Sequence, residues 1–173
     1  EGNIARQASG FVPLRIEGDG SQPVVVNGVD NWNGRIPASE MPRVLNPERD
    51  WVGTANHRVT DSDYPYVYTS YASPTWRYRR LIELFDVDQV SAEDHWQFIQ
   101  DNKNLMAQRL TSTIIDAISR DSGLRDFADL LSQWDFTDTR EQAAPAIFQA
   151  LYRHFARRVF QDELGDALAT KYL

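Results

Sequence analysis

The sequence contains no cysteine, no clustered histidines and no long apolar run in its 173 residues. Without cysteine, neither a disulfide framework nor a thiolate metal site can form. No stretch approaches the roughly 20 apolar residues that a membrane span needs. Basic residues are also in the minority, because 18 Lys and Arg stand against 25 Asp and Glu and give a net charge of −7. A nucleic-acid partner is therefore not expected, since such proteins usually carry a basic surface.

Self-contained catalytic motifs are missing as well. The sequence has no Gly-x-Ser-x-Gly elbow, no phosphate-binding loop, no glycine-rich dinucleotide motif and no His-Glu-x-x-His. His57, His95 and His154 lie far apart, and none has the spacing of a metal ligand. Asp61 and Asp63 carry the oxygen ligands that calcium prefers, but a solvated turn explains this pair better. These residues therefore predict no metal site.

The composition changes near Tyr71. Residues 1–71 hold seven of the nine glycines and six of the eight prolines. Since glycine and proline interrupt regular structure, residues 1–71 are predicted to be a strand and loop portion, and residues 72–173 a helical portion. The predicted fold class is α+β, and 42% hydrophobic residues are enough for a real core.

Short strands are predicted in the first portion. Residues 3–16 indicate two strands broken at Ser9 and Gly10, and residues 51–56 indicate a buried strand. Residues 27–47 are predicted to be irregular because they are rich in Asn, Gly and Pro. Residues 64–68 alternate, but Pro65 limits them to an edge strand or an extended loop.

Helical periodicity dominates the second portion. It predicts helices over 76–85, 105–118, 124–134 and 143–160, and a further helix that follows a capping box at Ser91. Their apolar stripes are expected to be core faces. The arginine group at 153, 157 and 158 is interpreted as a solvated helix face. The stripes are formed by Leu81, Leu84 and Phe85; Trp96 and Ile99; Leu105, Met106, Leu110, Ile114, Ile115 and Ile118; Phe127, Leu130, Leu131 and Trp134; and Ile147, Leu151, Phe155 and Phe160.

Aromatic residues are dense between Trp32 and Trp76. Three interpretations remain open: a platform on which sugars stack, a pocket for an acyl group, or the anchoring of core and loops. The residues are Trp32, Trp51, Tyr64, Tyr66, Tyr68, Tyr71 and Trp76.

An ordered series of short motifs runs along nearly the whole chain. The motifs are 2–4 (GNI), 37–47 (PASEMPRVLNP), 51–57 (WVGTANH), 63–66 (DYPY), 77–81 (RYRRL), 91–94 (SAED), 134–135 (WD) and 143–148 (AAPAIF). In this order they resemble the β subunit of the penicillin acylase (penicillin amidase) family.

The resemblance implies a fold and a reaction. Members of this family are N-terminal-nucleophile hydrolases with an αββα sandwich, and they cleave an acyl amide of the penicillin, cephalosporin or acyl-homoserine-lactone type. The nucleophile is an N-terminal serine whose own α-amino group serves as the base. Since residue 1 is Glu, the chain is expected to be an internal fragment of the β subunit that is inactive alone. Its expected partners are the remaining β-subunit segments, the α subunit and the acyl-amide substrate, with no nucleic acid or membrane.

Two catalytic residues are implied by the resemblance. Asn56 matches the asparagine of the oxyanion hole, where a neutral amide N–H stabilises developing negative charge. Arg77 matches an arginine that supports the active site, a role that suits a permanent planar cation. His57 stands where many relatives have a second Asn and is interpreted as a tolerated variation. Substrate-binding residues are not predicted.

The resemblance implies no cofactor in this chain and allows calcium in the intact parent. The family's calcium site draws on an acidic residue after the Tyr-Pro motif, but Tyr66, Val67 and Tyr68 occupy those positions here. No metal is therefore expected in this stretch. A periplasmic or secreted location is implied by the resemblance alone.

Two other interpretations compete with an amidohydrolase fragment. The aromatic residues between Trp32 and Trp76 fit a non-catalytic module that binds carbohydrate or a partner protein. Alternatively, the chain is a domain without a function of its own, whose apolar helices would associate once exposed.

Overall fold

The computed structural model describes residues 2–25 and 31–172. Contacts divide the chain into two units, Glu1–Asp88 and Gln89–Leu173. The first unit contains short strands and one helix, and the second contains helices. This mixture confirms the predicted α+β class.

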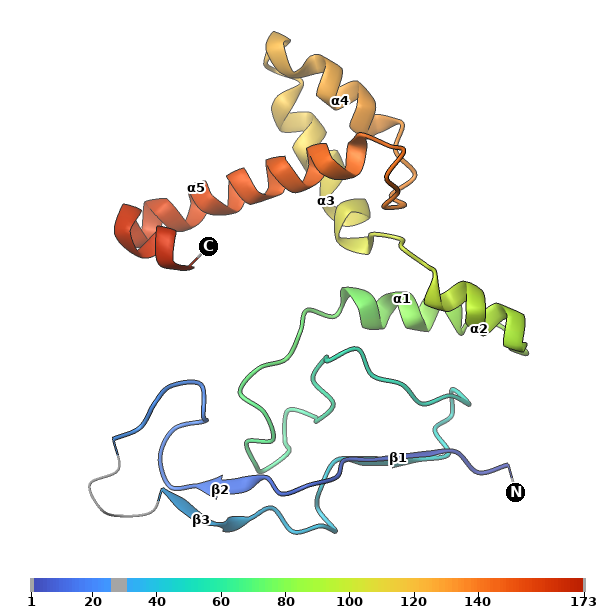
Figure 1. Cartoon of the computed structure of the whole chain (residues 1–173), viewed down its shortest axis with the longest axis vertical. Coiled ribbons are helices and arrows are strands. Elements are labelled where there is room, and N and C mark those ends of the chain that lie inside the picture. The colour runs from blue at the N-terminus through green and yellow to red at the C-terminus, as the bar shows by residue number, and fades with distance from the viewer. Residues whose placement is uncertain (1, 26–30, 173) are drawn as a thin grey trace. The chain divides into compact units, whose positions relative to one another are not determined.

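Two antiparallel strand pairs organise the first unit. Strand β1 (Ala5–Gln7) pairs with β4 (Arg43–Leu45), and strand β2 (Pro13–Arg15) pairs with β3 (Trp32–Arg35). Figure 1 shows β2 and β3 side by side. Because β1 and β2 lie on either side of Ser9 and Gly10, the two strands predicted over residues 3–16 are confirmed.

Two predictions about this unit are wrong. Residues 27–47 were expected to be irregular, yet they include β3 and β4; residues 27–30 of that range lie outside the described residues. Distant partners, rather than local composition, create both strands. The strand expected over residues 51–56 is a loop. Two of its carbonyl oxygens accept hydrogen bonds from arginine side chains instead of a neighbouring strand, Trp51 O from Arg49 and Ala55 O from Arg77.

Helix α1 (Trp76–Leu84) closes the first unit, and it confirms the helix predicted there. Tyr78, Leu81 and Phe85 lie three and four residues apart, so they share one side of the helix. Trp51 stacks on Phe85 with ring centroids 4.9 Å apart, and it also contacts Tyr78 at 6.2 Å. The loop before the helix is thereby attached to this side.

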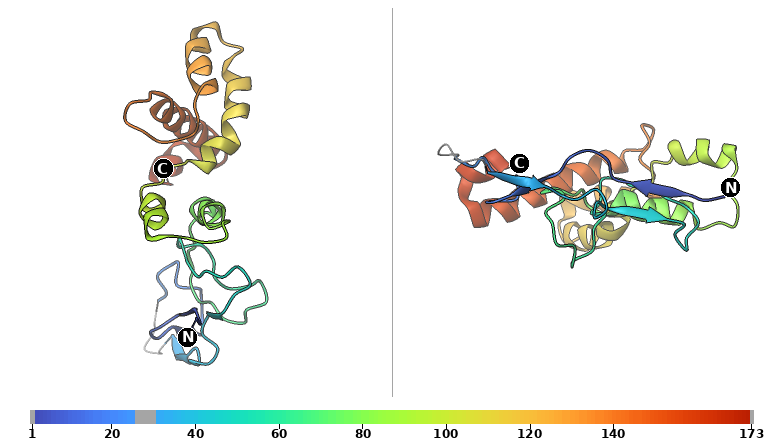
Figure 2. Two further views of the ribbon diagram at one scale, coloured as in Figure 1. Left: turned by 90° about the vertical axis from the view of Figure 1, so that its right-hand side faces the viewer. Right: turned by 90° about the horizontal axis from the view of Figure 1, so that it is seen from below.

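Helices form the second unit. They are α2 (Ala92–Ile99), α3 (Leu105–Ile118), the 3-10 turn η1 (Ser122–Leu124), α4 (Arg125–Ser132) and α5 (Ala144–Tyr172). Figure 2 shows α3 and α4 side by side, and α5 contacts both. Ser91 Oγ accepts a hydrogen bond from Asp94 N at 3.1 Å, and Asp94 Oδ2 accepts one from Ser91 N at 2.8 Å. The predicted capping box is thus confirmed.

The last helix is longer than predicted. Periodicity indicated an end near Phe160, whereas helical structure runs to Tyr172 with a break at Gly165, where φ is 72°. A positive φ is readily adopted only by glycine, so the break falls at the residue that tolerates it.

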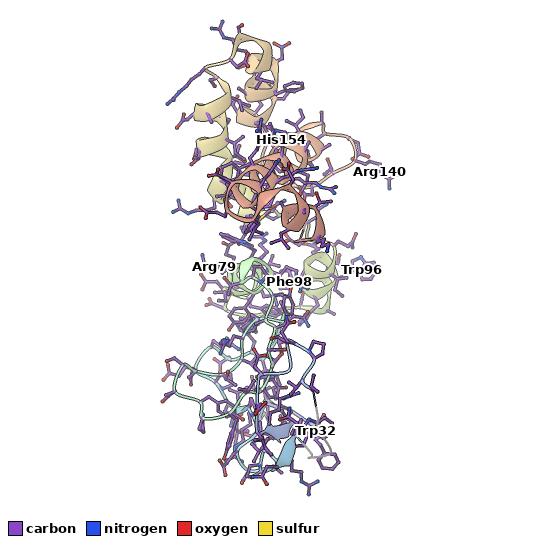
Figure 3. The ribbon with its side chains drawn as sticks, turned by 90° about the vertical axis from the view of Figure 1, so that its left-hand side faces the viewer. Trp32, Arg79, Trp96, Phe98, Arg140 and His154 are labelled. Atoms are coloured by element: carbon purple, nitrogen blue, oxygen red, sulfur yellow. The ribbon has the colours of Figure 1, made fainter. Side chains whose placement is uncertain are left out.

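The core of the second unit lies between α3, α4 and α5. Leu131 and Phe148 are fully buried, and Trp134 is 5% exposed. Other members of the predicted stripes are exposed, which corrects their assignment to the core. Periodicity identifies an apolar stripe but does not reveal which part of it a neighbour covers. The exposed members are Trp96, Ile99, Phe127, Leu130 and Phe155; Figure 3 shows the Trp96 side chain pointing away from its helix.

Within the described residues, none of the helices combines the length and apolar character needed to cross a membrane. The same part of the chain has no group of three or more His, Asp and Glu side chains placed to hold a metal ion.

Candidate functional site

The loop around Trp51 is attached to α1 by an arginine as well as by ring stacking. The Arg49 guanidinium lies 4.1 Å above the Trp51 ring, and its Nε donates to Trp51 O at 3.0 Å. Arg49 Nη1 also donates to the hydroxyl of Tyr78 on α1. Because cation–π and hydrogen-bond contacts act on the same residues, loop and helix are held in one arrangement.

This arrangement brings Asn56 and Arg77 together. Arg77 Nη2 donates to Asn56 Oδ1 at 3.0 Å and to Ala55 O at 3.1 Å. A guanidinium has no acceptor, so the amide oxygen of Asn56 must face Arg77. The Asn56 NH₂ group is therefore turned away from the arginine. Among the described residues, none accepts a hydrogen bond from it.

The backbone of Asn56 is fixed too. Its φ is 58°, in the left-handed region that asparagine tolerates better than most residues. Its carbonyl oxygen accepts a hydrogen bond from Ser73 N at 2.7 Å. The side chain itself is exposed. Asn56 thus offers a neutral N–H donor in a defined orientation to a molecule bound beside the loop.

His57 follows Asn56 and is attached to α1 by ring stacking. It stacks on Tyr78 with centroids 3.6 Å apart and 20° between the planes, and its Nδ1 accepts from Ala55 N at 3.4 Å. Burial lowers the pKa of His57, and the charges of Arg6 and Arg49 lower it further. The charged form is therefore disfavoured in the folded protein.

The lowered pKa of His57 predicts how stability depends on pH. Below the ordinary histidine pKa of about 6.5, unfolded chains bind a proton that the folded protein resists. The free energy of unfolding should therefore fall as pH drops below about 6.5, and His57→Asn should reduce this slope. Urea unfolding across this range measures it, with His154→Asn, at an exposed position on α5, as the control. An unchanged slope in His57→Asn would contradict the prediction.

A cavity of about 430 Å³ opens beside Asn56 and His57. Arg6 is the cation in its lining, Val12, Val59 and Tyr68 add apolar surface, and the remaining lining residues carry hydroxyl groups. Among the residues that the structure describes, no Asp or Glu lines it. The cavity therefore combines a positive charge with neutral donors and fits an uncharged or anionic molecule better than a cation.

The aromatic residues between Trp32 and Trp76 are divided among different contacts. Tyr64 and Tyr66 meet at 5.6 Å and both bind Glu40, where the Tyr66 hydroxyl donates to Oε2 at 2.5 Å. This hydrogen bond raises the pKa of Tyr66. Trp76 lies under the Arg79 guanidinium, whereas the Trp32 side chain is exposed.

Arg6 lies outside the sequence motifs and is not among the predicted site residues. Ile4, Arg6 and Ala8 are half-buried, while the residues between them are exposed. Such an alternation is typical of a strand with one inward face, but only the structure reveals it, because the residue types around Arg6 do not alternate between apolar and polar. The Asp61 and Asp63 pair, in contrast, is exposed in a turn as expected, and so are Arg153, Arg157 and Arg158 on α5.

Comparisons with known proteins agree on one family. The sequence matches the model of the family described as penicillin amidase over residues 1–173. It is 31% identical over 166 residues to the penicillin acylase 2 proenzyme of Pseudomonas sp. (strain SE83), covering 91% of this chain and 21% of that protein. It is 27% identical over 187 residues to the acyl-homoserine lactone acylase QuiP of Pseudomonas aeruginosa, covering 95% of this chain and 21% of that protein. The chain thus spans about a fifth of the length of the curated relatives it matches.

Proposed function

Because the chain belongs to the penicillin amidase family, we propose that it forms part of an acylase that hydrolyses an acyl amide. The named relatives act on different amides, but each reaction releases an acyl group from nitrogen. The proposed substrate is therefore a molecule with such an acyl–nitrogen bond, in an amide of the penicillin, cephalosporin or acyl-homoserine-lactone type.

The contact between Arg77 and Asn56 carries the proposal. Attack on an amide carbonyl places negative charge on its oxygen, and a fixed N–H donor stabilises that charge. Arg77 Nη2 donates a hydrogen bond to Asn56 Oδ1 at 3.0 Å. The NH₂ group of Asn56 is therefore left to serve as this donor. Asn56 is then the catalytic residue of the oxyanion hole, and Arg77 is a positioning residue that sets the orientation of its amide.

The nucleophile belongs to a segment outside this chain. By family resemblance it is a serine at the N-terminus of the mature β subunit. Its hydroxyl oxygen bonds to the carbonyl carbon, the carbon–nitrogen bond breaks, and the amine leaves with a proton; water then hydrolyses the acyl-serine. The αββα sandwich, the remaining β-subunit segments and the α subunit complete the proposed enzyme. Calcium in the intact parent and a periplasmic or secreted location also rest on the resemblance.

An acyl-enzyme experiment tests the function. The complete protein should release amine from a simple acyl anilide and carry one acyl group on its N-terminal serine, detected by mass spectrometry. The 173-residue chain alone should show neither, because Asn56 and Arg77 only support a nucleophile. Acylation of the isolated chain, or no turnover of any acyl amide by the complete protein, would contradict the proposal.

A further inference from the structure

Two neighbouring residues of the loop that precedes α1 contact two neighbouring residues of the helix. Asn56 is bound by Arg77, through the hydrogen bond from Arg77 Nη2 to Asn56 Oδ1 at 3.0 Å. His57, the next residue of the loop, stacks on Tyr78, the next residue of the helix, with ring centroids 3.6 Å apart and 20° between the planes. The loop therefore cannot move along the helix without breaking both contacts.

The Tyr78 ring is itself held in place. Its hydroxyl oxygen accepts a hydrogen bond from Arg49 Nη1, and its ring contacts Trp51 at 6.2 Å between centroids. The Arg49 guanidinium also lies 4.1 Å from the centroid of the Trp51 ring. Because these contacts act together, Tyr78 offers His57 a fixed surface for stacking.

The stack restrains a loop whose central residue has an uncommon backbone conformation. Asn56 has a φ of 58°, and such a conformation persists only where the surroundings enforce it. The Asn56 carbonyl oxygen accepts a hydrogen bond from Ser73 N at 2.7 Å, and His57 Nδ1 accepts one from Ala55 N at 3.4 Å. Releasing His57 from Tyr78 would remove one of these restraints and leave the direction of the Asn56 NH₂ group less defined.

We propose that His57 and Tyr78 are positioning residues of the acylase, because their stack fixes the loop that directs the Asn56 amide toward the developing oxyanion. This inference rests on the proposed function. A misplacement of about 1 Å at a catalytic group can lower the rate by about 10²-fold. The stack therefore contributes to kcat through Asn56, not through contact with the bond that breaks.

Protonation of His57 should weaken this arrangement. An imidazolium has an N–H on both ring nitrogens, so Nδ1 can no longer accept from Ala55 N. Burial and, after it, the charges of Arg6 and Arg49 lower the pKa of His57 from the ordinary 6.5. Attraction between the cation and the face of the Tyr78 ring offsets only part of this effect. The loop should thus be released as pH falls below about 6.5.

The surroundings of His57 contain cations but no paired anion. In the part of the chain that the structure describes, no carboxylate forms an ion pair with it. An acidic partner that would hold the charged ring in place is therefore missing there. The charged and titratable groups around it are Arg6 on β1, Arg49 in the loop, Arg77 and Tyr78 on α1, and Tyr68 and Tyr71 in the cavity lining.

Variants of Tyr78 in the complete protein test the stack with a simple acyl anilide. Tyr78→Leu should lower kcat by about tenfold to a hundredfold and change KM by less than about twofold, since the Asn56 donor acts on the transition state. Tyr78→Phe keeps the ring and loses only the hydroxyl, so it should recover most of this loss. Trp76→Leu removes a ring of the same helix that contacts Arg79 instead, and it should leave kcat unchanged.

A pH profile separates positioning from folding. His57→Phe keeps an aromatic ring for the stack but cannot be protonated. The amine of the N-terminal serine titrates in both proteins, so its effect cancels in the ratio of kcat for the unmodified protein to kcat for His57→Phe. This ratio should be constant above about pH 6.5, fall by about threefold or more toward about pH 5, and recover when the pH is raised again. His154→Asn, on α5, should show the unmodified profile.

The outcomes separate the two proposals. Unchanged kcat in Tyr78→Leu, an equal loss in Trp76→Leu, or a kcat ratio that stays constant at low pH would overturn the positioning role and leave the acylase intact. If Tyr78→Leu does not fold, the pH profile decides alone. If the unmodified protein turns over no acyl amide, the proposed function fails. Hydrogen exchange around Asn56 then decides whether the stack holds the loop, because Tyr78→Leu should raise it and Tyr78→Phe should not.

Discussion

Asn56→Gly in the complete protein is expected to lower kcat for amide hydrolysis by about 10²–10³-fold, the usual cost of removing one oxyanion-hole donor. Glycine is the informative replacement because it adopts the φ of 58° without strain. The backbone of the loop can then stay in place, and the hydrogen bond from Ser73 N to residue 56 O can remain. The variant therefore removes the amide and little else.

Alanine and aspartate at the same position sharpen the result. Asn56→Ala removes the same donor but must hold a left-handed φ, so it should add a loss of stability to the loss of kcat. Asn56→Asp keeps the shape and strengthens the attraction to Arg77, yet it places negative charge beside the developing oxyanion. Its kcat should therefore be as low as that of the glycine variant.

Asn46→Gly is the matched control for Asn56→Gly. Asn46 also has a positive φ, 44°, but its side chain accepts from Ile4 N at 2.9 Å and donates to Asn3 Oδ1 at 2.7 Å. Both are structural contacts of the strand pair. Asn46→Gly should lower the free energy of unfolding and leave kcat unchanged. Steady-state kinetics and urea unfolding of both variants separate the roles; a stability loss without a kcat loss in Asn56→Gly would make Asn56 structural as well.

Local patterns predicted the helices because their signals lie close together in the sequence. Ser91 and Asp94 stand three residues apart, as a capping box requires, and both of its hydrogen bonds form. Leu131 and Phe148 lie on predicted stripes and are fully buried. The two catalytic candidates came from a resemblance between motifs rather than from periodicity. The resemblance placed Arg77 near Asn56, and the structure adds the hydrogen bond from Arg77 Nη2 to Asn56 Oδ1.

Features that depend on distant residues were missed. Strand β3 forms because it pairs with β2, and strand β4 forms because it pairs with β1. Neither β3 nor β4 shows a strong strand pattern in its own sequence. Trp51 suggested a buried strand, but its ring packs on Phe85, the C-cap residue of a helix that begins 25 residues later. Arg6 was missed because its meaning depends on which face of β1 is covered. In each case a tertiary contact overrides the local preference.

Phe148→Ala should lower the free energy of unfolding of the second unit by about 3–5 kcal/mol. The Phe148 side chain is fully buried between helices and contacts the rings of Trp134 at 5.8 Å and Tyr152 at 6.0 Å, measured between centroids. Truncation removes this apolar surface and leaves a cavity that neighbouring helices fill only in part. Since small domains are stable by about 5–15 kcal/mol, the loss is a large fraction of the total.

Phe155→Ala, the same substitution on the same helix, provides the comparison. Phe155 also belongs to the stripe predicted from periodicity, but it is 64% exposed. Its truncation should change the free energy of unfolding by about 0.5 kcal/mol or less in the isolated chain. Urea unfolding followed by far-ultraviolet circular dichroism measures both variants. If Phe155→Ala costs as much as Phe148→Ala, another surface covers Phe155 in solution, and sizing of the chain by light scattering would then show association.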